Sequence, residues 1–184
     1  MTETYVSRDL GRVVFSAAEI GARVQEMARA IDAHYPAGED LLVLGLLKGA
    51  FIFVSDLVRS IRRPDLRVDF LVAALYGEGR VGNSDVRLLY ESDAPIEGRH
   101  VLLVEDIVDS GKTLARIGDA LAERSPKSLE VCALLHKRLT RDLSYEPRWV
   151  GFDAPPDWLV GYGLDHRGRF RHLPFIAAIE SGEE

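Results

Sequence analysis

The sequence has few cysteines and no excess of basic residues. Its 184 residues include one cysteine, Cys132, so an internal disulfide is excluded, and the apolar residues around it predict a buried thiol in a reducing compartment. Lys and Arg number 23 against 29 Asp and Glu, which gives a net charge of −6. This balance disfavours a general nucleic-acid or membrane-surface binder, so an anionic ligand would need local groups to hold it.

Long apolar runs are also missing. The longest, Leu41–Val54, is interrupted by Lys48 and is too short to span a bilayer. The segment Met1–Arg12 carries charges and no apolar stretch of the kind that directs secretion. Hydrophobic residues at 47% and charged residues at 28% lie near the globular average, which argues against disorder and against a fibre. We therefore expect a cytoplasmic protein with a single domain over residues 1–184.

The hydrophobic spacing predicts strands that alternate with helices. A capping box at Ser16–Glu19 begins a helix whose apolar residues recur at spacings of four and three. Further helices are predicted around residues 54–61 and 114–121. Strands are predicted at Leu41–Leu47, Val68–Tyr76, Val86–Tyr90, Val101–Val104, Leu129–Leu135, Leu159–Gly161 and Phe175–Ile179. This alternation is typical of an α/β fold with a parallel sheet covered on both faces, where ligands bind beyond the carboxyl ends of the strands.

Three short motifs resemble known sites but lack the context that those sites need. Gly77–Gly82 matches a dinucleotide-binding loop, yet the residues after it resemble a strand rather than the required helix. The Gly-Lys-Thr at 111–113 lacks the earlier glycine of a Walker A motif, because Asp106 stands there. The acidic pair at 105–106 lacks the downstream strands of a response-regulator receiver. We interpret residues 77–85 as a glycine-rich excursion between two strands.

The segment Val101–Leu114 is the strongest functional signal. A buried strand leads into Glu105 and Asp106, Asp109 follows three residues later, and a helix begins near Ser110. An ordinary capped helix would explain Asp109 and Ser110 but not the paired acids at the end of a strand.

A ribose 5-phosphate would use every part of this segment. Backbone N–H groups over residues 109–113, at the start of a helix, form a cradle for one phosphate. Ser110 and Thr113 can add hydroxyl donors. Glu105 and Asp106 can accept hydrogen bonds from vicinal sugar hydroxyls or face a divalent ion.

This segment closely resembles the 5-phosphoribosyl-1-pyrophosphate (PRPP) signature of type I phosphoribosyltransferases. The resemblance runs from about Val43 to Ile179 and includes Leu47-Lys48-Gly49, Leu135–Arg138 and the tail Val150–Asp165. The tail, with its ordered glycines, aromatics and one aspartate, is similar to that of the 6-oxopurine branch, the hypoxanthine–guanine phosphoribosyltransferases.

The resemblance implies a fold and an activity. The fold would be a single type I phosphoribosyltransferase domain, with a core at about 38–148, a small hood from about 1–15 and 149–184, and a flexible lid loop. The enzyme would serve purine salvage by transferring the phosphoribosyl group from PRPP to N9 of hypoxanthine or guanine, giving IMP or GMP and pyrophosphate. Mg²⁺ would be the cofactor, the substrates would be small molecules, and the chain would form a homodimer or homotetramer without nucleic-acid or membrane partners.

Site residues carry over by position. Asp109 would face purine N7 as general base or acid. The resemblance also implies a non-proline cis peptide in the Lys48–Gly49 loop. PRPP would be bound by Lys48, Gly49, Glu105, Asp106, Asp109, Ser110, Gly111, Lys112, Thr113 and Arg171. The purine would contact Lys137, Trp158 and Leu159, magnesium would contact Glu105, Asp106 and Asp165, and the lid would comprise Tyr76, Gly77, Gly79 and Gly82.

Plainer interpretations stand beside several of these assignments. Lys137 could be a solvated strand end, Trp158 could be a core residue, and Arg171 could belong to a basic surface run. Two positions depart from the family pattern, since Leu75 precedes Tyr76 where serine is usual and Trp158 replaces a phenylalanine or tyrosine. A different class also remains open, a phosphoribosyltransferase-fold regulator that senses nucleotides and binds RNA or DNA.

Overall fold

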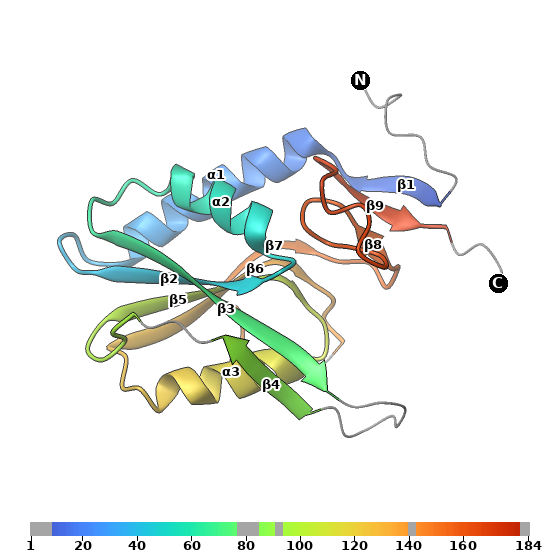
Figure 1. Cartoon of the computed structure of the whole chain (residues 1–184). Helices are drawn as coiled ribbons and strands as arrows, with labels where there is room; N and C mark the ends of the chain where they lie inside the picture. Colours follow the sequence, from blue (N-terminus) through green and yellow to red (C-terminus); the bar gives the residue numbers. More distant parts are fainter. Residues whose placement is uncertain (1–8, 77–84, 91–93, 140–142, 181–184) are drawn as a thin grey trace.

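The computed structural model describes residues 9–76, 85–90, 94–139 and 143–180. Its main sheet has the strand order β4-β3-β2-β5-β6-β7, in which β4 is antiparallel to β3 and the other pairs are parallel (Figure 1). The strands are β2 (Leu41–Leu47), β3 (Leu66–Tyr76), β4 (Asp85–Tyr90), β5 (His100–Val108), β6 (Ser128–His136) and β7 (Trp149–Asp153). The predicted α/β class is confirmed, with one antiparallel edge strand.

Helices cover both faces of this sheet, as predicted. α1 (Ala17–His34) and α2 (Phe51–Ser60) lie on one face and α3 (Lys112–Ala122) lies on the other (Figure 1). Two separate apolar clusters result. Val43 and Val104 point toward α1 and α2, whereas Leu42 and Leu103 pack with the apolar side of α3. Because alternate residues of one strand enter different clusters, β2 and β5 are apolar on both faces, which explains their continuous apolar runs.

The capping box at the start of α1 is present. Ser16 accepts a hydrogen bond from the Glu19 backbone N–H at 3.3 Å, and the Glu19 carboxylate accepts one from the Ser16 N–H at 2.8 Å. The apolar positions identified from the spacing are all buried: Ile20, Val24, Met27 and Ile31. Burying this stripe fixes α1 across the sheet.

The terminal segments form a second, smaller sheet beside the main one (Figure 1). It has the order β1-β9-β8, from β1 (Leu10–Phe15), β8 (Leu159–Val160) and β9 (Ile176–Ile179). A hood was expected from the ends of the chain and is confirmed, although β1 was not predicted as a strand. The first residues of the segment assigned to the hood, β7, pair with β6 and join the main sheet.

Two further expectations concern the cysteine and membrane-spanning segments. Cys132 is a buried free thiol inside β6, as predicted. In the ranges that the structure describes, no helix combines the length and apolar character needed to cross a membrane.

Candidate active site

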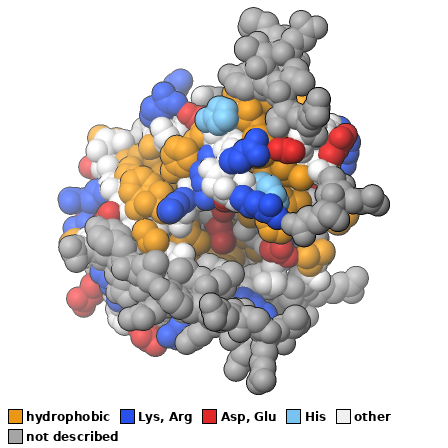
Figure 2. Space-filling view, turned by 45° about the vertical axis from the view of Figure 1, so that its right-hand side comes forward, with side chains coloured by type: hydrophobic (Ala, Val, Ile, Leu, Met, Phe, Trp, Pro, Cys, Tyr) orange, Lys and Arg blue, Asp and Glu red, His pale blue; other side chains and the backbone are white. Residues whose placement is uncertain are grey.

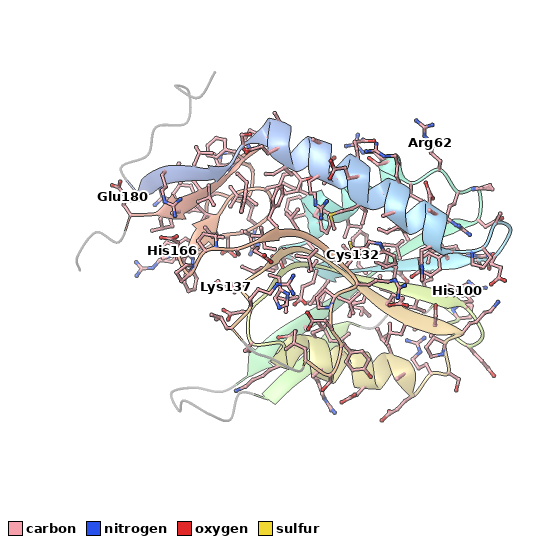
Figure 3. The ribbon with its side chains drawn as sticks, turned by 180° about the vertical axis from the view of Figure 1, so that it is seen from behind. Arg62, His100, Cys132, Lys137, His166 and Glu180 are labelled. Carbon is pink, nitrogen blue, oxygen red and sulfur yellow. The ribbon has the colours of Figure 1, made fainter. Side chains whose placement is uncertain are left out.

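The site lies where the parallel strands end. Lys48 directly follows β2, Asp109 follows β5 and Lys137 follows β6, and these three strands are neighbours in the sheet. Lys137 lies at the hood end of the molecule, whereas His100, at the start of β5, lies at the opposite end (Figure 3). A face turned toward the viewer in Figure 2 carries Lys and Arg side chains around a hollow with acidic side chains inside it.

The acidic pair belongs to β5 itself. The strand was expected to end at Val104, but it continues through Glu105 and Asp106 to Val108, because residues 105, 107 and 108 keep their pairing with β6. Ladder hydrogen bonds with β6 therefore outweigh the strand-ending signal of two carboxylates. As a result both acids are held on a rigid strand rather than on a loop.

Burial raises the pKa of both carboxyl groups. Glu105 is buried, and desolvation together with the charge of Asp106 raises the pKa of Glu105 to about 8. Desolvation also raises the pKa of Asp106 to about 6, although the Ile107 N–H donates to its Oδ1 at 2.9 Å and opposes the shift. Within the described residues, Glu105 Oε2 has no hydrogen-bond partner. An unpaired buried carboxylate oxygen is costly, so this atom is suited to a hydroxyl donor or a cation from a ligand.

The turn after β5 presents the start of α3. Gly111 precedes the helix with φ of 74°, a left-handed conformation, and a Cβ there would overlap the Leu143 side chain. The N-cap residue of α3 is Gly111 itself, which has no side chain to accept from the first N–H groups of the helix. Helix N-termini in this state bind anions. Asp109 and Ser110 are exposed in this turn.

A second loop approaches Asp106 from β2. The Leu47–Lys48 peptide is cis, as the family resemblance implied. Gly49 lies against Asp106 so closely that a Cβ on Gly49 would overlap the carboxylate. On its other side, the Gly49 carbonyl lies where a Cβ of Gly163 would be, and Gly163 has φ of 104°. Both glycines are therefore required for the loop to fit between β5 and the hood.

The hood contributes an ion pair to this region. Arg171 donates to the Gly163 carbonyl at 2.7 Å and pairs with Asp165 at 2.6 Å. Arg171 and Asp165 also act electrostatically on Asp106, the first lowering its pKa and the second raising it. Arg171 is half-buried and partnered, so it is not part of a solvated surface run.

Lys137 and Asp109 face each other across neighbouring strand ends. Lys137 Nζ lies 3.5 Å from Asp109 Oδ2, and the Lys137 side chain is 15% exposed. The Lys137 backbone N–H donates to the Val108 carbonyl at 2.9 Å, which extends the sheet by one bond. Lys137 is therefore fixed beside Asp109 and is not a solvated strand end. Arg138, in contrast, is exposed and pairs with Asp153 and Glu146.

Trp158 is not a core residue. Its side chain is 62% exposed, whereas Leu159 beside it is buried at the start of β8. The Ile179 N–H donates to the Trp158 carbonyl at 2.9 Å, so the backbone is held by the hood sheet while the ring faces outward.

The remaining predicted residues are those of the lid and those of the metal site. Tyr76 is the last residue of β3, and the other expected lid residues, Gly77, Gly79 and Gly82, lie outside the described residues. Among the described residues, no three Asp, Glu, His or Cys side chains gather closely enough to hold a metal ion by themselves.

The sequence did not single out His136. This residue is buried at the end of β6, and neither ring nitrogen has a hydrogen-bond partner among the described residues. Its Nδ1 lies 3.9 Å from Glu146 Oε1. Burial lowers the pKa of His136, so the imidazole next to Lys137 is neutral at neutral pH.

Gly163 belongs to the tail motif identified in the sequence, but only the fold reveals its contact with Gly49.

The chain is similar to known proteins over most of its length. Residues 14–167 match the model of the phosphoribosyl transferase domain. A hypoxanthine phosphoribosyltransferase of Salmonella typhimurium is 42% identical over 168 residues, 91% of this chain and 94% of the relative. A hypoxanthine-guanine phosphoribosyltransferase of Mycobacterium avium is 42% identical over 177 residues, 94% and 87% of the two chains. A crystal structure of a hypoxanthine-guanine phosphoribosyltransferase from Bacillus anthracis, 37% identical, superposes with a TM-score of 0.87 and covers 94% of this chain and 100% of that one.

Proposed function

The chain belongs to the phosphoribosyltransferase family, and we propose that it transfers the 5-phosphoribosyl group of PRPP to N9 of hypoxanthine or guanine, giving IMP or GMP and pyrophosphate. The observation that carries this proposal is the pairing of Lys137 with Asp109 at 3.5 Å, next to the carboxylates of β5. Asp109, Lys137 and the acid pair of β5 lie at one sheet edge, where they would serve as proton-transfer group, hydrogen-bond donor to a purine oxygen and ligands of the sugar. The matched relatives carry enzyme names, and nothing favours the nucleic-acid-binding regulator.

Residues that follow the ends of β2 and β5 would bind most of PRPP. The uncapped start of α3 and the hydroxyls of Ser110 and Thr113 would hold the 5′-phosphate, with Gly111 and Lys112 in the same turn. Glu105 and Asp106 would accept hydrogen bonds from the ribose hydroxyls, which would satisfy the unpaired Glu105 Oε2. Lys48, Gly49 and Arg171 would contact the pyrophosphate.

Mg²⁺ fits this set of groups. Its preferred ligands are oxygens, and in proteins it is usually bound by one or two carboxylates together with substrate phosphates. Glu105, Asp106 and Asp165 supply carboxylate oxygens here, and Glu105 Oε2 is buried without a partner among the described residues. When bound, the ion would neutralise charge on the leaving pyrophosphate.

The purine would lie between Lys137 and Trp158. The Lys137 ammonium would donate to the exocyclic oxygen, Trp158 would stack on the base, and the backbone of Leu159 would meet its edge. Asp109 would take up the proton from N7 while N9 bonds to C1′ and the bond from C1′ to pyrophosphate breaks; in the reverse direction it would return that proton. Water must be kept from C1′ during this step, a role that we assign to the lid that begins at Tyr76.

The reaction and its setting can be tested directly. We expect the purified protein to convert hypoxanthine or guanine with PRPP and Mg²⁺ into IMP or GMP and pyrophosphate, and to stop when a chelator removes the metal. We place this reaction in the cytoplasm, because its substrate PRPP is too highly charged to cross a membrane unaided. We also propose that the chain forms a homodimer or homotetramer. Tight RNA or DNA binding at physiological salt without PRPP-dependent turnover would contradict the proposal.

Gly49 offers a steric test of the pyrophosphate loop. In Gly49→Ala the new methyl group must displace the Asp106 carboxylate or the loop itself. Since a displacement of about 1 Å in an active site can cost roughly 10²-fold, we expect kcat/KM for PRPP to fall by about that factor. Gly21→Ala is the matched control, because a Cβ at Gly21 in α1 meets nothing within 4 Å. Equal steady-state kinetics of the two variants would refute this account of the loop.

A further inference from the structure

The Trp158 ring lies outside the apolar core. The side chain is 62% exposed, so core packing does not fix it. The ring contact recorded for it among the described residues is with His166, where the centroids are 6.1 Å apart and the planes meet at 84°. Aromatic pairs with this separation and a perpendicular arrangement attract one another.

His166 belongs to a firmly held hairpin. Its backbone exchanges two hydrogen bonds with Arg169, at 3.2 and 3.0 Å. Asp165, the preceding residue, accepts from the Gly168 N–H at 2.7 Å and pairs with Arg171 at 2.6 Å. Arg169 in turn pairs with Asp9 at 3.1 Å. The backbone that carries the imidazole is therefore held in place, and from this position the imidazole can set the orientation of the exposed indole.

The perpendicular geometry leaves room for a ligand. An imidazole that meets the indole edge-to-face leaves at least one indole face free, and a planar base stacks on such a face. A side chain that is ordered before binding loses less conformational entropy when the ligand arrives. Figure 3 places His166 and Lys137 toward the same end of the molecule, where the base would lie.

We propose that His166 is a positioning residue that holds the Trp158 indole in the orientation in which it stacks on the purine base. This inference rests on the proposed function and deepens it, because it names what orders the base-stacking ring. It also links the purine side of the site to the Asp165–Arg171 pair through one hairpin.

Kinetics of His166 variants test the proposal. In His166→Ala we expect the KM for hypoxanthine to rise about two- to tenfold, the factor that corresponds to loss of one aromatic pair, with kcat and the KM for PRPP unchanged within twofold. His166→Phe keeps a ring and should restore the KM for the base. His34→Ala is the matched control, since His34 makes the same edge contact with Trp149, at 5.2 Å, on α1.

A second measurement does not depend on turnover. With Trp149→Phe, Trp158 is the sole tryptophan, since the sequence has two. We expect His166→Ala to lower the fluorescence anisotropy of Trp158 in the free protein and His166→Phe to restore it. Unchanged anisotropy, an unchanged KM for the base, or an equal rise in the KM for PRPP would each overturn the proposal. Absence of turnover in the unmodified protein would instead refute the proposed function, and the anisotropy comparison would still decide the role of His166.

Discussion

Replacing Asp109 by Asn is expected to lower kcat by about 10²- to 10⁴-fold, the contribution of a positioned general acid or base. Asn has nearly the same shape and can occupy the turn after β5, but it cannot take up or deliver the proton at purine N7. Asp109 is 54% exposed, so a bound base can reach it directly. The rate of IMP formation at saturating PRPP and hypoxanthine measures the effect.

PRPP binding should survive this change. The groups proposed to hold PRPP are mainly on β5 and at the start of α3, and neither needs the Asp109 carboxylate. Calorimetric titration should therefore give a Kd for PRPP within a few-fold of the unmodified protein. Asp119→Asn is a suitable control, because Asp119 is an exposed acid of α3 that accepts from the Tyr145 hydroxyl at 3.1 Å. Turnover near the unmodified level in Asp109→Asn would end the assignment.

The sequence predicted those parts of the fold that depend on local pattern. β2 was identified because both of its faces are apolar, and α1 because its capping box and apolar spacing agree. β5 was predicted too short, since two carboxylates at a strand end suggest a loop, whereas pairing with β6 carries the strand on to Val108. β7 was missed because it is a short edge strand whose pairing with β6 depends on residues distant in sequence.

The site was predictable to a similar extent. The acids of β5 and Lys137 could be placed at one edge of the sheet, because the carboxyl ends of neighbouring parallel strands meet there. The close approach of Gly49 to Asp106 and to Gly163 involves three segments and has no local signature. The perpendicular pairing of Trp158 with His166 likewise arises from the hood and not from spacing.

The second large effect concerns the choice of base. We expect kcat/KM for hypoxanthine to exceed that for adenine by up to roughly 10⁴-fold, because a site built for a polar contact rejects a partner that leaves its donor unpaired. The Lys137 ammonium can donate to a 6-oxo group but meets a second donor in the amino group of adenine. The Lys137 side chain is 15% exposed and held 3.5 Å from Asp109, so it cannot easily turn to water instead.

Lys137→Met should remove most of this discrimination while keeping a side chain of similar length. Competition between hypoxanthine and adenine for limiting PRPP measures the ratio without depending on absolute rates. Arg138→Met provides the control, because the neighbouring guanidinium points away to Asp153 and Glu146 and its loss should leave the preference intact. Efficient use of adenine by the unmodified protein would show that the site does not select 6-oxo bases. An unchanged preference in Lys137→Met would show that another group makes the selection. The loss of discrimination should come mainly from slower use of hypoxanthine, since methionine offers adenine no acceptor and so gives that base no new bond.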